Sequence, residues 1–192
     1  MAADAPRSTL SLAILGLVAL HPSSGYDLRR IFLTTPMGHF SSSPGAIYPA
    51  LGQLERRNLI SGKVEKPDTL RPRKVFTITS KGMRVLKARL SESITQQDVK
   101  WHLDDLILRF SFMGEVLGEE RSLRFLDELV VRIDELVLIL RQHLEAERDQ
   151  MPRTGVYALE HGISKYRATA RWARRVRKDL TKGGTAPRDR VT

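Results

Sequence analysis

SSSPGAIYPALGQLERRNLI, residues 41–60, has the pattern of a capped amphipathic helix. Ser43 is placed to act as the N-cap, and Pro44 suits the first helical position, where its missing N–H would have no partner in any case. The apolar positions recur at spacings of four and three, so they share one face that we expect to point into a core: Ile47, Leu51 and Leu54.

The start of this helix carries small and hydroxyl-bearing residues and no carboxylate. They are Ser41, Ser42, Ser43, Gly45, Ala46 and Tyr48. Pro49 removes one internal hydrogen bond, so we expect an irregular first turn, or a regular helix that begins near Gly45 or Ala46. A helix tip with free N–H groups, hydroxyl donors and no acid is suited to close approach to phosphates and base edges.

Two helices precede this stretch and a hairpin follows it. The pattern predicts helices over residues 9–20 and 25–33, and the first is apolar nearly all round, as expected of a central core helix. Enrichment in Val, Ile, Phe and Thr predicts strands over residues 59–66 and 74–79, joined by the turn-rich loop 67–73. This order describes a winged helix-turn-helix with a two-stranded, basic wing. Its expected core is Leu12, Ile14, Leu15, Leu51, Leu54 and Phe76.

In such a fold the third helix enters the DNA major groove, and the wing meets the backbone or the minor groove. The candidate DNA-binding residues are Ser42, Ser43, Ala46, Tyr48, Gln53, Arg71, Arg73 and Lys74. Each also has a purely structural interpretation: a serine run often only caps a helix, and a basic hairpin tip is often only a solvated turn. For Tyr48, the structural interpretation is that the ring packs against Leu28 and only the hydroxyl is exposed. The combination of these features, in this order, favours DNA binding.

Charge supports an acidic partner. The chain of 192 residues has a formal net charge of +10. Residues 1–90 hold 14 Lys and Arg against 5 Asp and Glu, residues 91–150 hold 7 against 14, and residues 151–192 hold 11 against 3. Nucleic acid is favoured over a membrane, because the apolar run 10–20 is too short to span a bilayer. The acidic and basic segments of the second half could neutralise each other within one chain or between two chains, or the basic one could touch flanking DNA.

Several function classes are disfavoured. The chain has no cysteine, which excludes disulfides and thiol catalysis and fits a cytoplasmic protein. Its five histidines show no metal-ligand spacing, and no Ser-His-Asp set or phosphate-binding loop is present. We therefore expect no enzyme, no metal and no cofactor.

The second half is expected to be entirely helical. The pattern predicts helices over residues 97–113, 119–150 and 153–180, the second with apolar residues at threes and fours, as at a coiled-coil seam. The expected organisation is mainly α: a winged helix-turn-helix at 8–90, an all-helical dimerisation domain at 91–180 and a disordered tail at 181–192.

Dimerisation is expected because thin helices cannot bury so many aromatic residues alone. A two-fold dimer would place two reading heads about 34 Å apart, one turn of a palindromic operator. Its expected interface is Leu129, Ile133, Leu159, Ile163, Tyr166 and Trp172. Trp101 and Phe110 are candidates for stacking on a flat effector, with plain core packing as the alternative.

Three segments in order and spacing resemble PadR-type transcriptional regulators: LGLVALHPSSGYDLRRIF, SPGAIYPALGQLERRNLI and RPRKVFTITSKGMRVL. The resemblance covers about residues 10–90. A looser one links GVYALEHGISKYRATARW to the helical C-terminal domain of the longer family members. The resemblance to this family implies a dimeric cytoplasmic repressor that binds double-stranded DNA. Some members of the family release DNA when a small aromatic or cationic ligand binds.

The resemblance also implies roles for particular residues. Ser43, Ala46 and Tyr48 would lie on the recognition helix, and Arg71, Arg73 and Lys74 in the wing. Two positions depart from the family pattern. Asn58 stands where glycine is frequent after this helix, and a left-handed asparagine satisfies the same geometry. Val75 replaces a common aromatic residue beside Phe76, which puts the wing packing in question.

Two other functions remain open for a winged helix. One is a chromosome-associated protein that binds DNA without sequence preference, and the other is a protein-interaction module that does not bind DNA. Modules of the second kind usually lack a basic wing, so Arg71 and Arg73 argue against it. A footprint on one discrete palindrome would separate a regulator from a coating protein.

Overall fold

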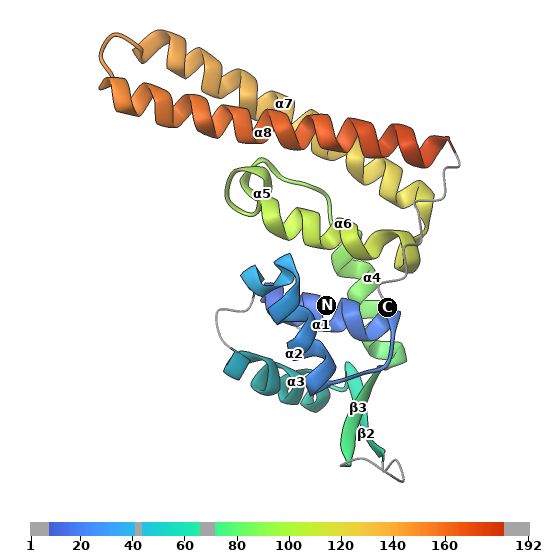
Figure 1. Ribbon diagram of the computed structural model, residues 1–192. Helices are drawn as coiled ribbons and strands as arrows, with labels where there is room; N and C mark the ends of the chain where they lie inside the picture. The colour runs from blue at the N-terminus through green and yellow to red at the C-terminus, as the bar shows by residue number, and fades with distance from the viewer. Residues whose placement is uncertain (1–7, 41–43, 66–71, 183–192) are drawn as a thin grey trace. The chain divides into compact units, whose positions relative to one another are not determined.

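The computed structural model describes residues 8–40, 44–65 and 72–182. The chain folds into two compact units (Figure 1). Among the described residues, the first extends to Glu92 and also includes Ser111–Leu117, and the second contains Ser93–Phe110 and residues 118–182. Ser111–Leu117 was expected in the helical domain. It lies with the first unit because the Phe112 ring packs against Gly16, where an added Cβ would be 2.5 Å from the ring.

The first unit has the element order predicted for a winged helix-turn-helix. Its elements are α1 (Thr9–Leu20), β1 (Ser23–Ser24), α2 (Gly25–Thr34), the 3₁₀ turns η1 (Pro36–Phe40) and η2 (Pro44–Ala46), α3 (Ile47–Arg56), β2 (Ile60–Glu65), β3 (Arg73–Ile78) and α4 (Ser80–Leu90). Figure 1 shows the β2–β3 hairpin, the wing, extending away from the helices of this unit. The predicted fold class is confirmed.

Helix α1 is the centre of this unit. It contacts α3, α4 and β3, and its side chains are buried around most of its circumference. The six predicted core residues are all at most 7% exposed: Leu12, Ile14, Leu15, Leu51, Leu54 and Phe76. Burying each large apolar side chain contributes about 1.5–3 kcal/mol, so this layer fixes how α3 is presented.

The sheet has one strand more than the sequence predicted. Its order is β1-β3-β2, and both pairs are antiparallel. In the wing, Ile60 pairs with Ile78 and Glu65 with Arg73. β1 is only two residues long, so it carries no alternating pattern that sequence analysis could detect.

Short polar contacts set the helix boundaries. Ser8 caps α1, Thr79 caps α4, and Ser24 forms a capping box with Asp27 at the start of α2. The irregular first turn expected for the third helix is confirmed, since η2 precedes a regular helix that begins at Ile47. The proposed cap, Ser43, lies outside the described residues.

Asn58 takes the left-handed conformation, with φ of 57°, directly after α3. Asparagine is one of the few residues besides glycine that adopt this conformation readily.

The second unit is helical within its described residues. It contains α5 (Gln96–Trp101), the first part of α6 (Leu103–Leu117), α7 (Glu119–Glu147) and α8 (Arg153–Thr181). The single helix predicted over 97–113 is wrong, because the chain leaves helical geometry at His102. The His102 N–H closes α5 on the Asp98 carbonyl, and the His102 carbonyl accepts the first bond of α6. No proline or glycine marks this break in the sequence.

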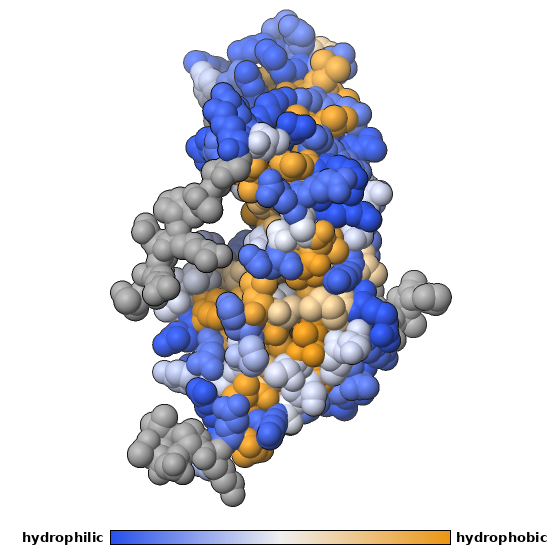
Figure 2. Space-filling view, turned by 90° about the vertical axis from the view of Figure 1, so that its right-hand side faces the viewer, coloured by the Kyte–Doolittle hydropathy of each residue, from blue (hydrophilic) through white to orange (hydrophobic). Residues whose placement is uncertain are grey.

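Helices α7 and α8 form an antiparallel hairpin, side by side along their length (Figure 1). The predicted apolar seam is confirmed on α7, where Leu126, Leu129 and Ile133 are fully buried. Near the turn of the hairpin, Leu144 packs with Val156 and Ile163. Hydrophilic residues dominate the face of this unit seen in Figure 2, with small apolar patches between them.

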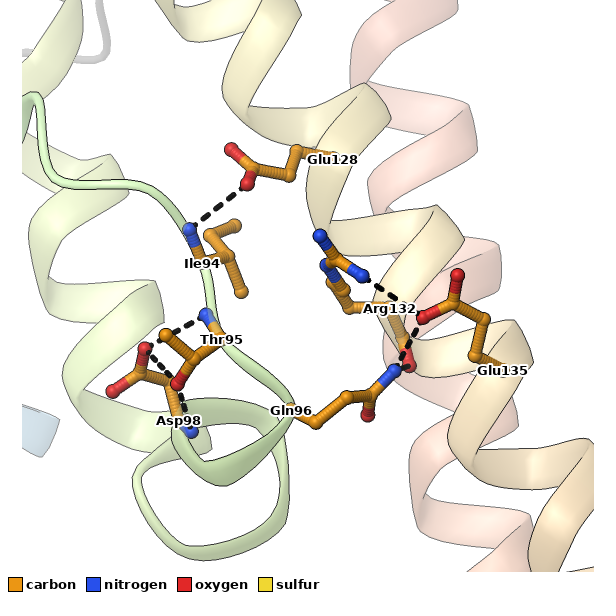
Figure 3. A network of polar contacts seen from close by, with 7 residues as sticks. All are labelled: Ile94, Thr95, Gln96, Asp98, Glu128, Arg132 and Glu135. Atoms are coloured by element: carbon orange, nitrogen blue, oxygen red, sulfur yellow. Dashed lines mark hydrogen bonds and ion pairs between the residues drawn. The ribbon is translucent and has the colours of Figure 1, made fainter.

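A polar network joins the start of α5 to α7 (Figure 3). The Ile94 N–H donates to Glu128 Oε1 at 3.0 Å, and Gln96 Nε2 donates to the Arg132 carbonyl at 3.3 Å. Arg132 also forms an ion pair with Glu135 at 3.2 Å. These contacts hold the short helix against the long one. None of the helices in the described parts of the chain is long and apolar enough to cross a membrane.

Gly82→Ala should destabilise the first unit. The first turn of α4 lies so close to the chain before β2 that an added Cβ would be 1.9 Å from the Leu59 carbonyl oxygen. Backbone must move to relieve this contact, at a cost of about 1–3 kcal/mol or more. Urea unfolding measures the change. Gly114→Ala in α6 is the matched control, because no atom lies within 4 Å of the added Cβ. It should stabilise by about 0.5–1 kcal/mol. Equal effects of the two changes would contradict the close contact.

Candidate nucleic-acid interface

The surface of α3 and the turn before it is divided into two faces. One face is buried in the first unit and consists of Ile47, Ala50, Leu51 and Leu54. The other is partly or fully exposed and consists of Gly45, Ala46, Tyr48, Pro49, Gly52, Gln53, Glu55 and Arg56. The spacing of three and four residues along the second set makes it one continuous stripe. Its one carboxylate is Glu55, near the C-terminal end of α3, so no acid lies on the stripe between Gly45 and Gln53.

Tyr48 is the largest side chain on this stripe, and the residue is 57% exposed. Its ring lies over Gly25, the first residue of α2, where an added Cβ would be 2.7 Å from Tyr48 Cε1. The missing side chain of Gly25 therefore makes room for the ring. The alternative in which only the Tyr48 hydroxyl is exposed is wrong.

The described wing presents two basic side chains. Arg73, at the start of β3, is 53% exposed and lies 3.6 Å from Glu65 on the paired strand. Lys74 is engaged more closely: its Nζ lies 2.8 Å from Glu55 Oε2 and 5.4 Å from the centre of the Phe76 ring. Arg73 is thus the more available of the two for a phosphate. The DNA contact of Lys74 stays a prediction.

Sequence analysis missed Glu55, the acidic residue of α3. Its Oε1 accepts a hydrogen bond from the Gly62 N–H at 3.2 Å, while its Oε2 accepts one from Lys74. The Lys74 hydrogen bond lowers the pKa of Glu55, against the opposing effect of burial. The sequence did show Glu55 as the single acid in a helix otherwise suited to DNA binding. Its partners Gly62 and Lys74 lie in the wing strands, which only folding brings near the helix.

A second carboxylate with fixed partners lies at the N-terminus of α2. The Ser24 hydroxyl donates to Asp27 Oδ2 at 2.7 Å, and this contact is the main cause that lowers the pKa of Asp27. The positive charges of Arg73 and Arg30 lower it further. Asp27 is therefore ionised at neutral pH and serves as part of the cap.

The structure describes five of the eight predicted DNA-binding residues. Ala46, Tyr48 and Gln53 lie on or next to the exposed stripe of α3, and Arg73 and Lys74 lie at the start of β3. Ser42, Ser43 and Arg71 lie outside the described residues. All eight assignments as DNA contacts remain predictions.

The predicted dimer-interface residues pack within their own unit. Leu129 and Ile133 are fully buried, and Ile163 is 6% exposed with Leu159 packed beside it. The Tyr166 hydroxyl donates to the Lys100 carbonyl at 3.2 Å. The Trp172 ring meets Phe110 edge-on at 5.5 Å between ring centres. Their part in a dimer stays a prediction. The large apolar residues that are exposed in the described part of the second unit are Trp101, Val131, Leu138, Ile139 and Tyr157.

The two candidate effector residues have different surroundings. Phe110 stacks on Phe125 at 6.2 Å and packs against Trp172, as expected of a core residue. Trp101 is 68% exposed, with the Lys100 ammonium 4.9 Å from its ring centre. A cleft of about 580 Å³ lies elsewhere in this unit, between α7 and α8, and neither residue lines it.

The basic end of α8 pairs with α7 of the same chain. Arg174 binds Asp134, and Arg177 binds Asp127. At these two positions the acidic and basic helices neutralise each other within one chain, which was one of the three alternatives left open by the sequence.

Comparison with known proteins identifies the first unit. The Transcriptional regulator PadR-like family matches residues 14–88. The chain carries a PadR-like regulator domain. This match covers α1 through most of α4, which includes the α3 stripe and the wing. Members of this family are transcriptional regulators and not enzymes, as the sequence predicted. A search among curated proteins found no match.

Solved structures similar to this PadR-like chain include three of bacterial regulators. Bacillus subtilis PadR in complex with operator DNA is 20% identical, with a TM-score of 0.43 over 89% of this chain and 98% of that one. The PadR-like transcriptional regulator BC1756 from Bacillus cereus is 24% identical, with a TM-score of 0.40 over 91% and 99%. Bacillus subtilis PadR in complex with p-coumaric acid is 20% identical, with a TM-score of 0.40 over 90% and 99%.

Proposed function

We propose that this protein is a dimeric, sequence-specific DNA-binding repressor that acts in the cytoplasm and is released from its operator by a small-molecule effector. The observation that carries the DNA-binding part is the exposed stripe of α3, free of acids between Gly45 and Gln53, which lies beside a basic wing in a PadR-like domain. Both features belong to the same compact unit.

In this proposal, α3 enters the major groove with its N-terminal end leading. Ala46 meets a thymine methyl group, and Gln53 reaches a base edge. Tyr48, together with Ser42 and Ser43 before the helix, donates to phosphate oxygens. Arg71 and Arg73 place the wing on the backbone or in the adjacent minor groove.

The DNA-binding test uses an operator found by genome-wide mapping and measures affinity by fluorescence anisotropy at several salt concentrations. Arg73→Ala should weaken binding to operator and unrelated DNA alike and reduce the salt slope by about one. Tyr48→Ala should weaken operator binding more, because it removes a phosphate contact and the packing on Gly25. Arg84→Ala is the control, since this exposed arginine lies on α4, outside the α3 stripe and the wing. Unchanged affinity in both test variants would refute the proposed contact surface.

A chromosome-coating protein is the second candidate, favoured by the net charge of +10. It would bind operator and unrelated DNA with similar affinity and leave no discrete footprint. A protected palindrome on the same mapped DNA supports the repressor instead.

We propose that the dimer forms through the second unit. The unit leaves large apolar side chains exposed on α7, including Leu138 and Ile139, each more than half exposed. In a two-fold dimer the exposed apolar surface of each subunit packs against the same surface of the other. The two DNA-binding units would then match a palindrome with half-sites about 34 Å apart. Light scattering during size-exclusion chromatography should give twice the mass of the chain. A monomer at micromolar concentration would contradict this arrangement.

We propose that an effector with a flat aromatic or cationic group binds at Trp101, which is exposed and therefore open to stacking. The chain has two tryptophans, so Trp172→Phe leaves Trp101 as the sole indole reporter. Titration with phenolic acids and with quaternary ammonium compounds should quench its fluorescence and lower DNA affinity in parallel. Trp101→Phe in the otherwise native chain is the matched control. Release of DNA without a change in the Trp101 signal would place the effector elsewhere.

A further inference from the structure

Both oxygens of the Glu55 carboxylate are engaged by the wing. Oε1 accepts from the backbone N–H of Gly62 in β2 at 3.2 Å, and Oε2 accepts from Lys74 in β3 at 2.8 Å. A single side chain of the recognition helix therefore binds both strands of the hairpin, through one backbone and one side-chain donor.

The carboxylate is partly exposed, and Gly62 lies close beneath it and Lys74. An added Cβ at Gly62 would lie 2.2 Å from Lys74 Cε and 2.9 Å from both Glu55 Oε1 and Phe76 Cε1. The absence of a side chain at Gly62 thus lets the stem of Lys74 and the carboxylate meet over the strand. Phe76 belongs to the buried core, so the contact rests on a fixed base.

We propose that Glu55 is a positioning residue for DNA recognition, whose carboxylate fixes the angle between the α3 stripe and the wing. The inference rests on the proposed DNA-binding function. Helix and wing must engage the duplex together. β1 pairs with β3 only at Phe76 and Val75, so the rest of the wing has two strands, and a two-stranded hairpin is only marginally stable by itself. A wing fixed before binding loses less conformational freedom on the DNA, so the contact should strengthen specific binding.

Simple electrostatics predicts the opposite effect of Glu55 on DNA affinity. A carboxylate beside a DNA-binding surface repels phosphates, and its removal should strengthen binding to any duplex. In the same view, Lys74 would leave Glu55 and bind a phosphate directly. The sign of the change on removing Glu55 therefore distinguishes positioning from repulsion.

Four variants of the full chain test the inference against the mapped operator and an unrelated duplex. Glu55→Ala removes both contacts and should weaken operator binding by about tenfold, equal to 1.4 kcal/mol. Glu55→Gln should lose less, because its amide oxygen still accepts from Gly62. Lys74→Met keeps the aliphatic stem and should weaken binding about as much as Glu55→Ala. The double variant Glu55→Ala with Lys74→Met should be no weaker than the worse single one, since the two act as a unit.

The matched charge control is Glu65→Gln. It removes the same charge from the wing, where Glu65 lies 3.6 Å from Arg73 and binds no residue of α3 in the described contacts. It should leave operator affinity unchanged or raise it. Because this inference has Lys74 bind Glu55 in place of the phosphate contact predicted from the sequence, the salt slope should stay at the native value in Glu55→Ala and Lys74→Met.

Hydrogen exchange reports the contact without DNA. The Gly62 amide should exchange faster in Glu55→Ala than in the native chain, while amides in α1 stay protected. If Glu55→Ala fails to fold, Glu55→Gln and Lys74→Met carry the same comparison.

Two results would overturn the inference. One is operator binding by Glu55→Ala as tight as the native protein or tighter. The other is a salt slope reduced by about one in Lys74→Met, which would make Lys74 a phosphate ligand. If the native chain itself binds no operator, the proposed function fails, and Gly62 exchange alone then reports on the contact.

Discussion

The packing of α3 on the apolar helix α1 is the constraint on which the rest of the first unit depends. α1 is buried around most of its surface and contacts α3, α4 and β3. Because Leu51 and Leu54 are held in this core, the opposite side of α3 must face outward. The orientation of the recognition surface thus follows from hydrophobic burial, and no polar residue on the exposed stripe is needed to set it.

Polar contacts then refine what burial has placed. Glu55 binds both wing strands, Ser24 and Asp27 cap α2, and left-handed Asn58 turns the chain from α3 into β2. Each contact contributes only on the order of 1 kcal/mol, but each fixes the position of the wing or the point where a helix begins or ends. Gly25 and Gly62 contribute by the space they leave, one for the Tyr48 ring and the other for Lys74.

The second unit follows a different principle. Its α7–α8 hairpin buries the apolar seam within one chain, and Arg174 and Arg177 bind acids on the facing helix. Residues chosen from the sequence as a dimer interface, such as Leu129 and Ile133, fill this internal seam. A heptad-like pattern has the same period whether the facing helix belongs to the same chain or to a partner, so periodicity alone does not distinguish them.

The sequence by itself determined the helices and wing strands of the first unit, its core residues and the irregular start of the third helix, because spacing and proline effects are local. The left-handed position after that helix was expected from the family resemblance. It did not show β1, the break at His102 or the role of Glu55. Tertiary structure decided β1 and the role of Glu55, since they depend on residues far apart in the chain: Ser23 lies opposite Phe76, and Glu55 binds Lys74. It also decided that Phe112 packs with the first unit, because only the folded chain brings its ring against Gly16.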